Sequence, residues 1–150
     1  MPAVSPSAIR QAVSAAVATA NADLHESPWL SDGPMRDPQP ALDLAYSVTV
    51  PTTQPVEARR FRGDDGVRCR TTVRVRVLVT LRQDGAVADY DDALDVEAAV
   101  CGAVAQMVSA DFTAPALQRC DRQPVGDDTG VLLTSEWTVD HVVALMPAGD

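Results

Sequence analysis

The 150-residue chain contains no lysine, so all twelve of its basic side chains are arginines. Aromatic residues make up only 4% of the sequence, which leaves few side chains for stacking on nucleic-acid bases. No uninterrupted apolar run approaches the roughly 20 residues of a membrane helix. The start, MPAVSPSAIR, lacks the basic and apolar regions of a signal peptide. We therefore expect no membrane contact and a protein that is made and folded in a cytoplasm.

The sequence also lacks the side-chain groupings that catalysis and metal binding require. Its two histidines, His25 and His141, are far apart, and no H-E-x-x-H, C-x-x-C or glycine-rich phosphate loop is present. Three cysteines without close spacing predict three free thiols. We expect no catalytic residue, cofactor or metal. If the chain were a small cytoplasmic enzyme or ligand-binding domain, its candidate residues would be His141, Cys120 and Asp121, which no motif places together.

The most distinctive stretch that is present is RCRTTVRVRVLVTLR, residues 68–82. Its odd positions are mostly apolar and its even positions are mostly arginine, an alternation that predicts a strand with one buried face. Fifteen strand residues would span about 50 Å, whereas strands usually have about 5 to 6 residues. So long a strand in so small a chain needs an explanation.

The other elements follow from periodicity and turn residues. Ser5 and Pro6 suit the start of a helix, and Asp91 or Asp92 can cap a second one. The expected order is a helix at 5–24, a proline-rich loop at 25–40, a strand at 42–50, a hairpin at 55–82 turning at 63–66, a helix within 89–110, and a closing hairpin of strands at 114–125 and 131–145. This order predicts a single α+β domain over residues 1–150, with a largely antiparallel sheet and two helices packed on one face.

The length of the 68–82 strand conflicts with the length of the second helix. A helix of about 19 residues spans about 28 Å and cannot cover 50 Å of strand. We expect one of two solutions. Either the strand bends at a bulge, or part of its apolar side projects beyond the core with the arginine-rich end and is covered by another chain.

The arginines are concentrated in one segment. Residues 59–82 hold eight arginines against Asp64 and Asp65, a local charge of +6 in a chain of net charge −9. Such asymmetry predicts a charged contact surface, with an acidic protein surface favoured over nucleic acid as its partner. A solvated edge hairpin remains the alternative. The candidate interface residues are Arg59, Arg60, Arg62, Arg68, Arg70, Arg74, Arg76 and Trp29.

The last strand offers partners for some of these arginines. Its polar face carries Glu136 and Asp140, so it is acidic where the polar face of the long strand is basic. If the two strands are neighbours, Arg74 or Arg76 opposite Glu136 or Asp140 would form a cross-strand ion pair.

The order of elements, with the strand R-x-T-V-R-V-R-V-L-V, the helix D-D-A-L-D-V-E-A-A-V and the strand G-V-L-L-T-S-E-W-T-V-D-H-V-V-A-L, resembles the tail terminator (tail completion) proteins of long-tailed bacteriophages and gene transfer particles. The resemblance covers residues 5–145 and is one of order, length and pattern. It implies a structural virion protein of the tail neck, assembled in the host bacterial cytoplasm.

The resemblance further implies a homo-oligomeric ring, usually of six subunits. Such a ring caps the tail tube, ends its polymerisation and provides the docking surface for the head connector, while DNA passes through the lumen without specific binding. The implied partners are other copies of the chain, the tail tube protein and the head-to-tail connector. The matching contact segments are the hairpin at 55–82 and the loop at 25–40. Another head-to-tail joining protein, or an oligomerising binding module outside phages, remains open.

Overall fold

The computed structural model of the chain describes residues 1–27, 43–56, 66–81 and 86–144. In chain order the elements are α1 (Pro6–Ala20), β1 (His25–Glu26), β2 (Ala45–Pro55), β3 (Gly66–Thr80), α2 (Ala86–Ala105), β4 (Ala116–Val125), α3 (Gly126–Thr129) and β5 (Gly130–Ala144). The strands form one sheet in the order β1-β2-β3-β5-β4, and only the two-residue β1 pairs in parallel. The predicted α+β class is confirmed.

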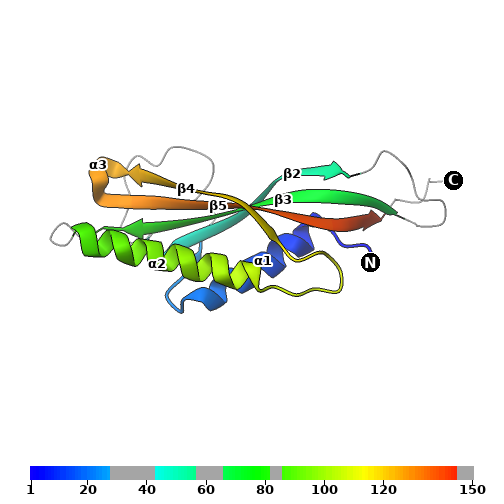
Figure 1. Ribbon diagram of the computed structural model, residues 1–150, viewed down its shortest axis with the longest axis horizontal. Helices are drawn as coiled ribbons and strands as arrows, with labels where there is room; N and C mark the ends of the chain where they lie inside the picture. Colours follow the sequence, from blue (N-terminus) through cyan, green and yellow to red (C-terminus); the bar gives the residue numbers. More distant parts are fainter. Residues whose placement is uncertain (28–42, 57–65, 82–85, 145–150) are drawn as a thin grey trace.

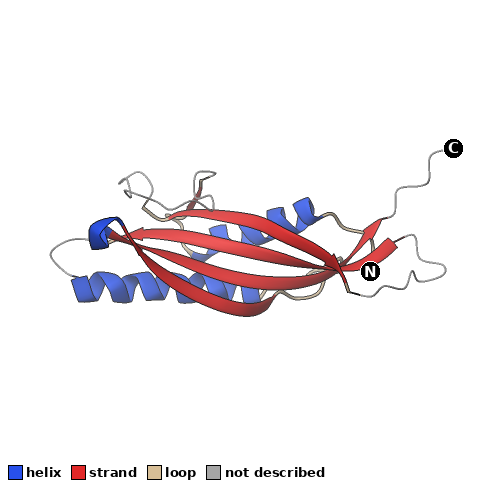
Figure 2. Ribbon diagram, turned by 90° about the horizontal axis from the view of Figure 1, so that it is seen from above, coloured by secondary structure: helices blue, strands red, loops and turns tan. Residues whose placement is uncertain are grey.

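The sheet is a single elongated layer with α1 and α2 on the same face, as Figures 1 and 2 show. We call the face that carries the helices the inner face and the opposite one the outer face. The inner face of β3 is made by its odd positions, because strand side chains alternate between the two faces. Valines dominate these positions and are buried: Val73, Val75, Val77 and Val79. Neither α1 nor α2 is long and apolar enough to cross a bilayer.

The predicted long strand exists, and it pairs without interruption with an equally long β5. The register runs from Gly66 opposite Ala144 to Thr80 opposite Gly130, so neither strand breaks within the pair. A side chain at Gly66 would place its Cβ 2.9 Å from the Val143 carbonyl oxygen, so this end of the pair requires glycine. The prediction that the long strand and the last strand are neighbours in the sheet is therefore confirmed.

The other antiparallel neighbour of β3 differs from the prediction. β2 does not end at residue 50 but continues to Pro55, which lies opposite Cys69. The prediction that a separate strand begins at about residue 55 was therefore wrong. A register shift between Thr49 and Thr52 marks a bulge that accommodates Pro51, which has no N–H to give to a regular ladder. Residues 57–65, with most of the expected turn, lie outside the described residues.

The helices of the inner face cover only part of the long strands. α2 has 20 residues and spans about 30 Å, whereas the 15 residues of β3 span about 50 Å. Figure 1 shows α2 under the end of the sheet where β3 finishes and α1 under the middle, while the other end of the sheet extends past both helices. The inner side chains of β3 are nevertheless buried from Cys69 to Val79, and Val67 is half-buried. Cover by another chain at the Gly66 end stays a prediction.

The ends of the helices test the capping predictions. Ser5 caps α1 by accepting a hydrogen bond from the Ala8 amide at 3.2 Å, with Pro6 as the first helical residue, as predicted. The cap predicted for the second helix was wrong. α2 begins at Ala86, so Asp91 and Asp92 are exposed residues within the helix. Asp89 lies in the first turn, where its charge favours the positive end of the helix dipole.

A chain of polar side chains, which begins at the exposed Thr53 and ends at the buried His141, connects strands at the end of the sheet beside the amino terminus. The Thr53 and Thr71 hydroxyl oxygens are 2.8 Å apart, and the Thr71 hydroxyl is 2.7 Å from His141 Nε2. His141 Nδ1 lies 3.1 Å from the carbonyl oxygen of Val4. Both ring nitrogens of this fully buried histidine therefore have partners, which satisfies its hydrogen-bonding needs.

Candidate partner-binding surface

The outer face of the sheet carries no helix among the described residues, and it is charged. The even positions of β3 and β5 point to this face, so arginines from β3 meet carboxylates from β5. Arg74 lies directly opposite Glu136, with Nη2 and Oε1 2.8 Å apart. Arg70 lies opposite Asp140, with Nε donating to Oδ1 at 2.7 Å and Nη2 to Oδ2 at 3.0 Å. The predicted pairing of Arg74 with Glu136 is confirmed.

The two pairs differ in their exposure to solvent. The side chains of Arg74 and Glu136 are 24% and 18% exposed, whereas those of Arg70 and Asp140 are 55% and 14% exposed. The bidentate hydrogen bonds from Arg70 lower the pKa of the Asp140 carboxyl, against the opposing effect of its partial burial. The same contact raises the pKa of Arg70. The Asp140 carboxylate is thus held in the charged form by its neighbour on β3.

The remaining predicted interface residues fall into two groups. Arg68 and Arg76 lie on the same outer face and are half-buried; Arg68 Nη2 is 3.8 Å from Asp140, and Arg76 lies opposite Thr134. Trp29, Arg59, Arg60 and Arg62 lie outside the described residues. The structure thus aligns the four arginines of β3 along one face, beside the acidic residues of β5. Their predicted role in binding a partner stays a prediction.

β4 forms one edge of the sheet and is exposed along most of its length. It pairs only with β5, so its other backbone edge has no strand partner among the described residues. Arg119 on this strand lies near two carboxylates, at 2.6 Å from Asp121 and 3.7 Å from Glu136. These charges extend the outer-face pairs to the edge. Charged side chains and Pro124 are typical of an edge strand that resists unspecific pairing.

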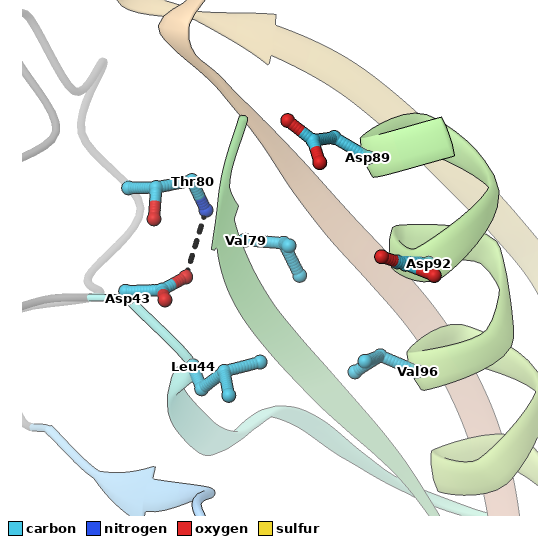
Figure 3. A pocket seen from close by; sticks show the side chains of 7 residues that line it. All are labelled: Asp43, Leu44, Val79, Thr80, Asp89, Asp92 and Val96. Atoms are coloured by element: carbon cyan, nitrogen blue, oxygen red, sulfur yellow. Dashed lines mark hydrogen bonds between the residues drawn. The ribbon is translucent and has the colours of Figure 1, made fainter. Parts of the chain in front are cut away.

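A cavity of about 260 Å³ lies at the end of the sheet where β3 finishes (Figure 3). It is lined by Asp43, Leu44, Val79, Thr80, Asp89, Asp92 and Val96. Asp43 faces the α2 carboxylates across this space, and its Oδ1 accepts a hydrogen bond from the Thr80 amide at 2.9 Å. Asp43 therefore completes the hydrogen bonding at the end of β3. No group of three or more His, Cys, Asp or Glu side chains in the described part of the chain could hold a metal ion.

The residues considered for an enzyme do not form a site. Cys120 lies opposite Ser135 on the inner face, while His141 lies opposite Cys69, six residues further along β5. Six strand residues span about 20 Å. Asp121 points to the other face of the sheet, because it is adjacent to Cys120 on the same strand. The three side chains therefore cannot act on one substrate atom.

Sequence reasoning missed one set of contacts, between α2 and β4. The Sγ atoms of Cys101 and Cys120 are 3.8 Å apart, and Arg122 donates from Nε to Glu97 at 3.0 Å. Glu97 and Cys101 are one helical turn apart, and Cys120 and Arg122 are alternate strand residues. This spacing indicated that each pair lies on one face of its own element. Nothing in the sequence indicated that these two faces pack against each other.

Comparisons with known proteins bear on the fold. Neither the models of protein families nor the curated proteins include a match to this sequence. Among solved structures, the fold is similar to that of a chain in a structure described as "Virion of native gene transfer agent (GTA) particle". The TM-score is 0.56 at 13% sequence identity, and the match covers 89% of this chain and 94% of that chain. The similarity spans nearly the whole of both chains, and at this identity it establishes a shared fold.

Proposed function

We propose that this chain is a structural virion protein of a tailed phage or gene transfer particle that forms a ring on the end of the tail tube. The observation that carries the proposal is the fold similarity to a chain of a gene transfer agent virion, which extends over nearly the full length of both chains. The order of elements that suggested tail terminators is also the order in the structure. The ring, six subunits in the expected case, ends tube polymerisation and offers its free surface to the head connector.

The outer face of the sheet supports a role in binding other proteins. Arginines and carboxylates alternate across β3 and β5, half-exposed, over a surface that neither α1 nor α2 covers. Interfaces between proteins favour arginine, because its planar guanidinium can engage carboxylates with two hydrogen bonds. Arg70 keeps 55% of its side chain exposed although it is paired with Asp140, so it can also contact a second protein. The tail tube protein and the connector are the expected partners.

The described residues on either side of the most arginine-rich segment lie at the same end of the sheet. Val56, bonded through its amide to the Arg68 carbonyl at 3.0 Å, and Gly66 are the described residues on either side of that segment. Arg59, Arg60 and Arg62 lie between them in the sequence. We propose that these three arginines contact an acidic surface of the tube or of a neighbouring subunit. Arg68 and Arg70, which follow this segment on β3, have Asp140 as an intramolecular partner.

The test is tube assembly in the presence of the protein. Tail tube protein from the same genome is polymerised with and without this chain, and tube lengths are measured by electron microscopy. The expected result is short tubes, each with a ring at one end. Unrestricted tubes without rings would contradict the proposed capping. A ring that binds the connector but leaves tube length unchanged would instead identify a head-to-tail joining protein.

A variant with Arg59, Arg60 and Arg62 replaced by serine tests the contact segment. If the three arginines act through a contact with the partner, the thermal midpoint should change little while capping of tubes weakens at least tenfold. The control replaces Arg10 and Arg122 by serine, which removes positive charge from surfaces that bear ion pairs away from the outer face. Equal capping by the two variants would show that this segment makes no specific contact.

A further inference from the structure

The contact between α2 and β4 consists of an ion pair and a pair of cysteines that lie beside each other. Glu97 and Cys101 lie one turn apart on α2, and Arg122 and Cys120 lie two residues apart on the inner side of β4. The Glu97 carboxylate accepts from Arg122, and the Cys101 sulfur meets the Cys120 sulfur at 3.8 Å. The ion pair therefore holds the helix and strand in the register that brings the two sulfur atoms together.

From this geometry we propose that Cys101 and Cys120 form an oxidisable thiol pair, which a small-molecule disulfide converts to an intramolecular disulfide bond between α2 and β4. A disulfide bond requires sulfur atoms about 2.05 Å apart, so the two must approach by about 1.8 Å. A void of about 10 Å³ adjoins Cys101, between α2 and the inner faces of β3 and β5, so the packing around this side chain is not completely filled. The inference does not depend on the proposed virion role.

The two thiols have different roles in the reaction. Both are half-buried, but Cys120 belongs to an exposed edge strand, whereas Cys101 lies between α2 and the sheet. Burial, together with the neighbouring Cys120 and Glu97, raises the pKa of Cys101 to about 12. Because the thiolate is the attacking species, Cys120 attacks the oxidant and Cys101 resolves the resulting mixed disulfide.

The proposed oxidant is oxidised glutathione. The Cys120 thiolate attacks one of its sulfur atoms, so a bond forms between Cys120 and glutathione and one glutathione leaves as a thiolate. Cys101, after losing its proton to solvent, attacks the Cys120 sulfur, and the second glutathione leaves. The two protein thiols lose two electrons and two protons in total. One molecule of oxidised glutathione is thereby reduced to two glutathione molecules.

The disulfide bond would attach β4, an edge strand with few buried side chains, to α2. Only Val125 of β4 is buried, and Cys120 is its one half-buried residue. A cross-link to α2 removes conformational freedom from the unfolded chain and holds the edge strand in place. We expect oxidation to raise the thermal midpoint by about 5 to 10 °C.

Peptide mapping of the wild-type protein gives the decisive result. The reduced protein is incubated with oxidised glutathione, quenched in acid, alkylated under denaturing conditions and digested with trypsin. Because the chain has no lysine, cleavage after Arg82, Arg119 and Arg122 places Cys101 and Cys120 in separate peptides, 83–119 and 120–122. We expect these two peptides to be joined, with Cys69 alkylated. Glutathione retained on Cys120, or a link to Cys69 or to a second chain, would overturn the proposal.

Two variants separate the cross-link from other effects of oxidation. Cys69→Ser, on β3, should form the same linked peptides and show the same rise in thermal midpoint as the wild type. Cys120→Ser, at a half-exposed position of the edge strand, should fold but show no rise after the same treatment. A rise of several degrees in Cys120→Ser would contradict the assignment, because the stabilisation would then come from another modification.

The rate of bond closure provides a further check. Around Cys101, α2 contributes Glu97, β4 contributes Cys120 and Arg122, and β5 contributes Ser135. Because Cys101 must lose a proton before it attacks, loss of the Cys120–glutathione intermediate should become about tenfold faster for each unit of pH between 7 and 9. A closure rate independent of pH in this range would exclude Cys101 as the resolving thiol.

Discussion

The two faces of one sheet show how the same strands meet opposite requirements. On the inner face, Val75 and Val77 of β3 are at most 2% exposed beneath the helices. On the outer face, Arg74 and its neighbours are half-exposed and paired with carboxylates of β5. Since successive strand residues point to opposite sides, a one-residue slip would exchange the two environments. The register of β3 against β5 is therefore fixed by the large cost of burying arginine and exposing valine.

The largest expected effect comes from placing a charge on the inner face. Val75→Asp should abolish soluble expression or unfold the protein, because a buried carboxylate without a partner costs several kcal/mol. Thr72→Asp is the matched control, since Thr72 is half-exposed on the outer face between Arg70 and Arg74. It should express as a folded protein. Circular dichroism and soluble yield compare the two; equal tolerance would contradict the assignment of the faces.

A smaller effect is expected from the chain of polar side chains on the inner face. Thr71→Val keeps the shape of the side chain but removes the hydroxyl between Thr53 and His141. The free energy of unfolding should fall by about 1 to 3 kcal/mol, because the buried His141 Nε2 loses its hydrogen-bond partner. Thr72→Val on the outer face should change it by less than about 0.5 kcal/mol. Urea unfolding measures both, and similar values would show that the chain of hydroxyls contributes nothing.

On the outer face, the Arg74 and Glu136 pair should contribute less than a buried contact. Replacing either residue by alanine should cost about 1 kcal/mol, because both side chains are only partly buried. A double-mutant cycle with both alanines should give a coupling energy of about 0.5 kcal/mol or more. Exchange of the two charges, Arg74→Glu with Glu136→Arg, should recover part of the loss. If the two single effects simply add, the pair does not stabilise the fold.

The smallest effect is expected at Asp140 and appears as a dependence on pH. Its pKa is lowered in the folded state by the hydrogen bonds from Arg70, so its contribution is complete above the unfolded pKa of about 3.9. That contribution is lost as the pH falls through the lower folded pKa. Asp140→Asn should reduce stability at pH 7 by less than about 1 kcal/mol and flatten the decline below pH 4. Parallel acid declines in the two proteins would argue against this linkage.

Local patterns predicted the features that depend on neighbours in the sequence. The alternation in residues 68–82 predicted the buried inner positions of β3, and Ser5 with Pro6 predicted the start of α1. The alternation did not predict the burial of Leu78, which lies on the outer face and is fully buried in a second apolar cluster with Ala45 and Val125. The complementary charges of β3 and β5 predicted the pairing of Arg74 with Glu136. These predictions succeeded because strand alternation and helix capping act over a few residues, and because a cross-strand pair follows once two strands are neighbours.

Other features depended on which surfaces packed together. The amino acid sequence by itself determined the α+β class, the two faces of the long strand and the position of its arginines. Only the tertiary structure decided that β2 runs past Pro51, that α1 packs beside α2 on the inner face, and that Cys101 meets Cys120. The physical reason is that these contacts join segments distant in the chain. Their stability comes from apolar area buried between whole elements, for which local periodicity gives no partner.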